Sequence, residues 1–121
     1  MPPGRTKVVV FSSSTLFRQG LESMLDESPA VEIAGMTGLW ETVLSQIQAL
    51  HPDAVVVDRD DHVPDNFLDQ LFESAAEIRV VILSLQDDRL TVYTQSSISH
   101  PRRPQLLAAV TQRFDHTSAA S

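Results

Sequence analysis

The sequence VVVFSSSTLFRQGL, residues 8–21, joins a β-branched apolar run to an amphipathic segment through four consecutive hydroxyl residues. The continuous run Lys7–Phe11 is typical of a strand buried on both faces. Leu16 to Asp26 has the spacing of a helix, which we expect a preceding hydroxyl to cap. The carboxyl end of a first strand is where α/β proteins often place their chemistry. Here Ser12–Ser14 provide neither an acid, a base nor a glycine.

The same alternation of short apolar runs and helical spacing continues along the chain. Strands are expected at Val31–Met36, Ala54–Asp58 and Arg79–Leu83, and helices at 39–50, from Pro64 to Ala75, and around Leu106–Phe114. Strands that alternate with helices indicate a parallel sheet covered on both faces. For 121 residues the sequence therefore predicts one flavodoxin-like, doubly wound α/β domain with strand order 2-1-3-4-5.

Residues 84–103 break this alternation. LTVYT, residues 90–94, has the composition of a strand, but it follows Leu83 too soon for a parallel crossover of a dozen or more residues. We predict that it pairs antiparallel with the fourth strand through a QDD turn and forms the edge of the sheet. The alternative is a stunted helix here, with SSIS, residues 96–99, as a parallel fifth strand. Either arrangement leaves the fourth helix lost or stunted.

Composition limits the classes of function. The net charge is −7, and the basic pair Arg102–Arg103 is most simply a solvated helix start, so this domain is not expected to bind nucleic acid itself. The chain has no cysteine, no apolar run of membrane-spanning length and no signal-peptide core, which leads us to expect a cytoplasmic protein. We expect a flexible arm at 1–6, a single domain over 7–114 and a flexible tail at 115–121.

Several stretches together carry a family resemblance. KVVVFSSSTLFRQGLESML, AVEIAGM, HPDAVVVD, RVVILS and LLAAV resemble the receiver domains of two-component response regulators. The likeness is greatest to receivers that precede a helix-turn-helix domain in bacterial transcription regulators, a subgroup to which the turn Arg18–Leu21 is fairly specific. The resemblance runs from Lys7 to about Leu85 and resumes at Leu106–Phe114.

The resemblance assigns roles to five positions. In that family two acids end the first strand and hold Mg²⁺, and these positions are Ser12 and Ser13 in this chain. The aspartate that receives the phosphoryl group corresponds to Asp58. The switch hydroxyl that ends the fourth strand corresponds to Ser84, and the lysine that ends the fifth falls near Ser99.

At several of these positions the chain departs from the family pattern, and the departures bear on phosphorylation. Transfer of a phosphoryl group to a carboxylate needs metal and cationic groups to neutralise charge, and Mg²⁺ prefers anionic oxygens. Serines replace the acid pair, and the chain has no lysine after Lys7. We therefore predict a phosphorylation-independent receiver that is not an enzyme and has no cofactor or metal. A receiver still phosphorylated on Asp58 remains an alternative.

The polar residues of the sequence also allow other kinds of site. The hydroxyl-rich loop Ser12–Thr15 could hold a phosphate-bearing ligand at a helix N-terminus, although it lacks glycine. Asp58–His62 is rich in oxygen ligands, but its spacing matches no known metal loop, so a solvated loop is the simpler interpretation. No G-x-S-x-G elbow supports a serine hydrolase. The four histidines are expected at the surface: His51, His62, His100 and His116.

Loss of the fourth helix suggests how the domain acts. It should uncover one face of the fourth strand and of Leu90–Thr94, and exposed apolar faces and strand edges favour association. We expect a symmetric homodimer, or binding to another signalling protein, through residues 85–105 and the last helix. The expected interface residues are Leu90, Val92, Tyr93, Leu107 and Val110. A DNA-binding output domain, if one exists, lies outside this chain, and no membrane contact is expected.

Overall fold

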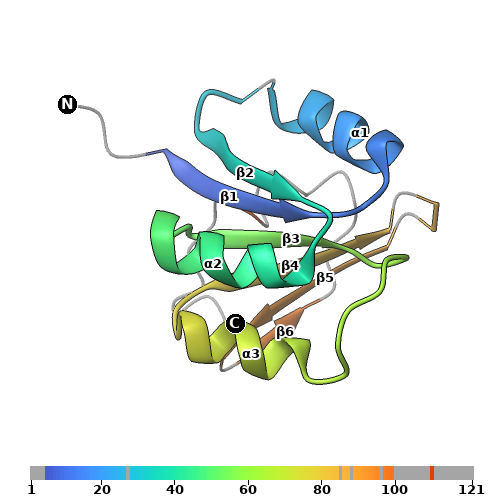
Figure 1. The fold of residues 1–121 in the computed structure, drawn as a ribbon. Coiled ribbons are helices and arrows are strands. Elements are labelled where there is room, and N and C mark those ends of the chain that lie inside the picture. Colours follow the sequence, from blue (N-terminus) through green and yellow to red (C-terminus); the bar gives the residue numbers. More distant parts are fainter. Residues whose placement is uncertain are drawn as a thin grey trace.

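A single six-stranded sheet organises the part of the chain that this computed structural model describes, namely residues 5–26, 28–84, 86–87, 89–95, 97–99 and 110. The strand order is β2-β1-β3-β4-β5-β6 (Figure 1). In chain order the elements are β1 (Thr6–Phe11), α1 (Thr15–Asp26), β2 (Val31–Thr37), α2 (Trp40–Leu50), β3 (Ala54–Asp58), α3 (Phe67–Ser74), β4 (Arg79–Ser84), β5 (Arg89–Thr94) and β6 (Ser97–Ser99).

The first four strands form a parallel sheet, as the alternation of strands and helices predicted. β1 pairs with β2 and with β3, and β3 pairs with β4, all in parallel. The valines at 8–10 and 55–57 are buried because these two central strands are covered on both faces. The predicted flavodoxin-like order 2-1-3-4-5 is confirmed for the first five strands.

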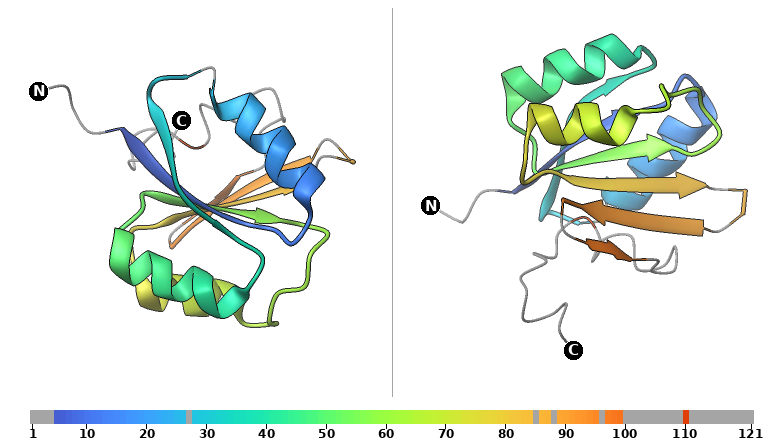
Figure 2. Two further views of the ribbon diagram at one scale, coloured as in Figure 1. Left: turned by 45° about the horizontal axis from the view of Figure 1, so that its top comes forward. Right: turned by 90° about the horizontal axis from the view of Figure 1, so that it is seen from below.

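Helices cover the two faces of the sheet unequally. α1 lies on one face of the sheet (Figure 2, left). Its Phe17, Leu21 and Leu25 belong to a core cluster with residues of strands β1 to β5. α2 and α3 lie on the other face, where Val43, Ile47 and Leu71 fill the second core. These two helices lie over the β1–β3–β4 side of the sheet, and β5 and β6 extend beyond them (Figure 2).

Trp40 joins the two helices of that second face. Its ring makes edge-on contacts with Phe11 and Phe67, with centroid distances of 5.3 and 6.0 Å. Its indole Nε1 donates a hydrogen bond of 2.7 Å to Gln70 Oε1 on α3. Trp40 is therefore a packing residue between α2 and α3, where edge-on aromatic pairs stabilise beyond their buried area.

The irregular segment forms antiparallel strands. β5 pairs antiparallel with β4, which confirms the predicted direction of LTVYT. β6 then pairs antiparallel with β5, so the alternative of a parallel fifth strand at SSIS is wrong, and β5 is not the edge of the sheet. Only four residues separate Ser84 from Arg89, too few for a helix and a crossover, and this shortness forces a hairpin.

The limits of the domain are partly visible. β1 begins at Thr6, whose amide donates to Ala30 O at 2.8 Å. Residues 1–4 of the arm expected over 1–6 lie outside the described residues. Val110 is helical and buried, as expected for the last helix. The rest of that helix and the tail at 115–121 lie outside the described residues. Among the described residues no helix is both long and apolar enough to cross a membrane.

Candidate functional site

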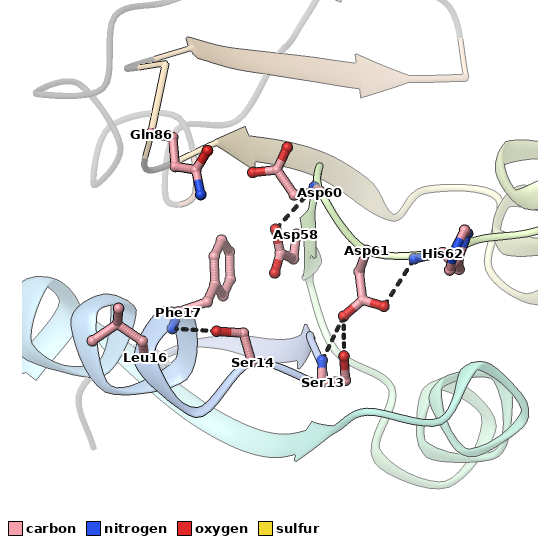
Figure 3. A pocket seen from close by; sticks show the side chains of 9 residues that line it. All are labelled: Ser13, Ser14, Leu16, Phe17, Asp58, Asp60, Asp61, His62 and Gln86. Carbon is pink, nitrogen blue, oxygen red and sulfur yellow. Dashed lines mark hydrogen bonds between the residues drawn. The ribbon is translucent and has the colours of Figure 1, made fainter.

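Three connecting segments meet at the carboxyl end of the parallel strands and enclose a cleft of about 370 Å³ (Figure 3). One segment follows β1, the second follows β3, and the third is the β4–β5 turn. The cleft therefore occupies the position at which this class of sheet binds its ligands. Its lining residues are Ser13, Ser14, Leu16, Phe17, Asp58, Asp60, Asp61, His62 and Gln86.

Asp58 lies at the inner end of this cleft and is held by neutral donors. Its side chain is only 6% exposed. The hydroxyl of Ser12, itself fully buried, donates a hydrogen bond of 2.6 Å to Asp58 Oδ2, and the Asp60 amide donates one of 3.0 Å to Oδ1. Short hydrogen bonds to a carboxylate are the stronger kind. Ser12 thus stabilises the carboxylate of Asp58 through a short hydrogen bond.

Asp61 makes a second link between the same two loops. Ser13 donates to Asp61 Oδ2 from its amide at 2.6 Å and from its hydroxyl at 2.8 Å, and the His62 amide donates to Oδ1 at 2.8 Å. Burial raises the pKa of Asp61, but these hydrogen bonds and the charge of His62 lower it, and the net pKa lies below the ordinary value of 3.8. We call the Ser13 and Asp61 pair the Ser13–Asp61 clasp.

Gly38 allows the serine loop to sit where it does. A Cβ at this position would lie 3.0 Å from the Ser13 Cα and 3.2 Å from the Ser13 Cβ. A side chain would therefore push the β1–α1 loop away from β2. The close approach of these backbones is a reason for glycine here, independent of any turn.

The third serine of the loop begins α1. Ser14 Oγ accepts a hydrogen bond from the Phe17 amide at 3.2 Å, which confirms the expected hydroxyl cap. The Ser14 amide in turn donates to Ser12 Oγ at 3.0 Å. The hydroxyls of Ser12 and Ser13 and the amide of Ser13 are thus bonded to Asp58 and Asp61 rather than directed at a ligand. Three carboxylates also face the cleft, so the phosphate-ligand alternative is disfavoured.

Ser84 has a structural role at the β4–β5 turn. Its side chain is fully buried, and its Oγ accepts a hydrogen bond of 3.2 Å from the Asp87 amide. In this structure the hydroxyl at the switch position thus caps the hairpin that replaces the fourth helix. Ser84 does not line the cleft that contains Asp58.

The lysine-equivalent position assigned to Ser99 is wrong. Ser99 pairs with Val92, which pairs with Val81 in the middle of β4, so Ser99 lies neither on the strand next to β4 nor at the end of the sheet where Asp58 lies. The residue paired with Ser84 is Arg89. Sequence reasoning missed this basic residue because the reversal of β5 brings its first residue, rather than its last, to the cleft end of the sheet.

Three of the expected interface residues belong to the core. Leu90, Val92 and Val110 are at most 2% exposed and pack on the α1 side of the sheet. Their use as an exposed interface is therefore wrong. Tyr93 points to the opposite face and is half-buried, and Leu107 lies outside the described residues.

The histidines and the acidic loop do not form a metal centre in the described part of the chain. His62 is exposed, and the exposed His51 ends α2 with a φ of 50°, while His100 and His116 lie outside that part. No group of three or more histidine, aspartate or glutamate side chains there is arranged to hold an ion.

Comparisons with known proteins agree with this geometry. The signal receiver domain of the response regulator NarL from Mycobacterium tuberculosis is similar over 68% of each chain, with 26% identity and a TM-score of 0.60. The response regulator domain of Thermotoga maritima CheB matches 66% of this chain and 60% of its own, with 21% identity and a TM-score of 0.57. A mutant of the anti-anti-sigma factor PhyR from Bartonella quintana covers 66% of this chain and 34% of its own, at 13% identity and a TM-score of 0.56. The last two likenesses concern the fold alone.

A curated relative extends the likeness to sequence. Protein-glutamate methylesterase/protein-glutamine glutaminase 2 of Cereibacter sphaeroides is 37% identical over 84 residues, which are 68% of this chain. The chain covers 23% of the length of that relative. No family model matches the chain.

Fold, site position and comparisons together define the class of protein. The molecule is a receiver-type α/β domain with the sheet order of flavodoxin-like proteins and an antiparallel hairpin after β4. The chain belongs with the receiver domains of response regulators, the proteins of two-component signalling.

Proposed function

We propose that the chain is a phosphorylation-independent receiver domain that works by binding proteins in bacterial signal transduction, with transcription regulation as its context and the cytoplasm as its location. The observation that carries the proposal is the 2.6 Å hydrogen bond from Ser12 Oγ to Asp58 Oδ2. At this position the resemblance expects an acid that binds a metal. Ser12 instead provides a neutral hydroxyl that donates a hydrogen bond directly to the carboxylate of Asp58.

Charge supports the proposal. Phosphoryl transfer to Asp58 would bring an anion into a cleft that already holds three carboxylates. Without a divalent cation at Ser12 and Ser13 that approach is electrostatically unfavourable. Arg59 directly follows Asp58 and Arg89 pairs with Ser84, but neither of these arginines lines the cleft. The domain is proposed as non-catalytic, because the match to the methylesterase covers only 23% of that protein.

The direct test is an NMR titration of the chain with Mg²⁺ and then beryllofluoride, which mimics a phosphoryl group on aspartate. We expect the amide signals of Asp58 and Ser84 to stay where they are. A conventional receiver studied in the same buffer shows that the reagent is active. Saturable shifts at both residues would establish a working phosphoryl pocket and contradict the proposal.

We further propose that a second copy of the chain covers the sheet face left open by the missing fourth helix. Ile82 and Tyr93 are only half-buried there, and Ile98, which is paired with Tyr93, is 59% exposed. Paired residues of neighbouring strands share a face, so these three side chains form one apolar patch, which we call the β5 patch. The β5 patch contains no acid, so two copies carrying −7 each can meet there with least repulsion.

Light scattering at increasing protein concentration tests the dimer. The wild-type chain is expected to dimerise, and Tyr93→Glu should weaken self-association because it places a charge in the β5 patch. Gln48→Glu, on the exposed side of α2, makes the same charge change elsewhere and should have no effect. A wild-type monomer at high micromolar concentration would contradict the proposal, as would equal association of the two variants.

A further inference from the structure

The open face of the sheet, which carries the β5 patch, is bordered on one side by α3. α2 packs on β1 and β2, and α3 lies beside it in the connection from β3 to β4 (Figure 1). Gln70 of α3 faces α2, since its Oε1 accepts the indole hydrogen bond of Trp40. Phe72 is two residues further on, about 200° around the helix, and so lies on the side of α3 toward β5. It is half-buried and packs on the same core cluster as Ile82 and Tyr93. The β5 patch therefore has Phe72 as a wall on one side and β6, the edge strand, on the other.

The height of α3 restricts how a second copy can approach this face. A helix stands about 10 Å above the sheet that it covers, the same distance that separates two sheets packed face to face. A twofold axis that runs across the strands keeps the lateral order of the elements, so it sets the α3 helices of the two copies against each other. A twofold axis that runs along the strands reverses this order, so each α3 lies beyond the β6 edge of the other copy. Only the second axis lets the two β5 patches meet.

The pairing of β5 with β6 provides matching contacts for this axis. Tyr93 and Ile98 are paired, so they lie at the same level along the strands. A twofold axis that runs along the strands between β5 and β6 preserves this level and exchanges the two strands. It therefore places Ile98 of one copy opposite Tyr93 of the other, in two equivalent contacts. Ile98 is 59% exposed in the single chain, so its burial between the copies favours association.

We infer that two copies stack their β5 and β6 strands face to face about a twofold axis parallel to the strands, with Ile98 of each copy between Tyr93 and Phe72 of the other. The inference rests on the dimer of the proposed function and specifies its symmetry and its central contact. Sheets packed face to face keep their mean strand directions within about 30° of each other, as this axis allows.

Spin labels at the two ends of β5 measure the direction of the axis. The chain has no cysteine, so Gln86→Cys and Gln95→Cys each provide a single labelling site. Both glutamines are exposed, and they flank β5, whose six residues span about 20 Å. Pulsed dipolar spectroscopy on each labelled dimer, and on a mixture of the two, gives the distances between copies. With the axis along the strands, labels at the same position should be closer to each other than labels at positions 86 and 95. The reverse order would show an axis across the strands and would overturn the inference.

Substitution of Ile98 tests the contact itself. Ile98→Ser should raise the dissociation constant of the dimer, measured by sedimentation, at least about tenfold, because each dimer loses two buried isoleucine side chains. Leu16→Ser is the control, because it makes a comparable change at a leucine that is 79% exposed and lies outside the β5 patch. It should leave the dissociation constant unchanged.

The possible failures are distinguishable. Equal dissociation constants for Ile98→Ser and Leu16→Ser would overturn the inferred contact, but a dimer of other geometry would remain. A wild-type chain that stays monomeric would contradict the proposed dimer as a whole, and this inference with it. Neither result alters the beryllofluoride titration, which tests independence of phosphorylation separately.

Discussion

Replacement of two acids by serines changes the electrostatics of the cleft at the scale of single residues. Acids at positions 12 and 13 would face Asp58 and Asp61 at hydrogen-bond distance and would need a cation between them. Serine hydroxyls instead donate to both carboxylates and so join the β1–α1 loop to the β3–α3 loop. Under the proposed function the same serines also remove the metal ligands that phosphoryl transfer needs.

The Ser13–Asp61 clasp predicts a pH-dependent contribution to stability. The pKa of Asp61 is lowered in the folded chain, so its contribution is present above the unfolded value, near 3.8, and is lost as the pH falls through the folded value. Ser13→Ala removes one of the donors and should cost about 0.5–1.5 kcal/mol at pH 7.

Urea denaturation from pH 7 down to pH 2.5 measures this effect. The stability difference between the wild-type chain and Ser13→Ala should shrink as the pH falls below 3.8. Ser23→Ala, at an exposed position of α1, is the control and should differ little from the wild type at every pH. A Ser13→Ala deficit that stays constant over this range would show that the carboxylate of Asp61 is not its source.

At the scale of elements, the hairpin between β4 and β5 is the main departure from a receiver domain. A parallel crossover would need a helix between these strands, and the four residues that connect them cannot provide one. The buried hydroxyl of Ser84 then has a new partner, the Asp87 amide in the turn. The residue that would act as a switch in the family is therefore committed to holding the hairpin together.

Ser84→Ala should loosen this hairpin. The Asp87 amide loses its acceptor, which should destabilise the chain by about 0.5–1.5 kcal/mol, and its hydrogen exchange should accelerate. The amides of β1 serve as an internal reference, because the central strand exchanges only through larger openings. Unchanged exchange at Asp87 would mean that the hydroxyl does not hold the turn in solution.

At the scale of the whole molecule, the leucines of α1 divide between the core and the surface. Leu21 is fully buried in the core on the α1 side, and Leu16 is 79% exposed on the same helix, beside the cleft. Leu21 therefore stabilises the core, and Leu16 is accessible at the surface. We therefore expect that Leu16 can be replaced without unfolding the domain.

Two alanine variants test that separation. Leu21→Ala should cost about 2–5 kcal/mol because it leaves a cavity in a closed core. Leu16→Ala should change the free energy of unfolding by less than about 0.5 kcal/mol. Both values are obtained from urea denaturation followed by the fluorescence of Trp40. A cost for Leu16→Ala similar to that of Leu21→Ala would show that Leu16 is a core residue rather than part of a surface.

The sequence by itself determined the parallel part of the sheet and the position of the site. In continuous β-branched runs such as Val8–Val10 and Val55–Val57, apolar side chains point to both faces of the strand. Both faces must therefore be buried, and the local sequence pattern is enough to predict a central strand. The resemblance to receiver domains also assigned Ser12 and Asp58 to one site. The tertiary structure decided the rest. The Ser13–Asp61 clasp joins residues 48 positions apart. The antiparallel direction of β5 places Arg89, and not Ser99, at the cleft end of the sheet, and Leu90 and Val92 are buried. Local composition indicates a strand but not its direction or its partner, because pairing energy comes from residues distant in the chain.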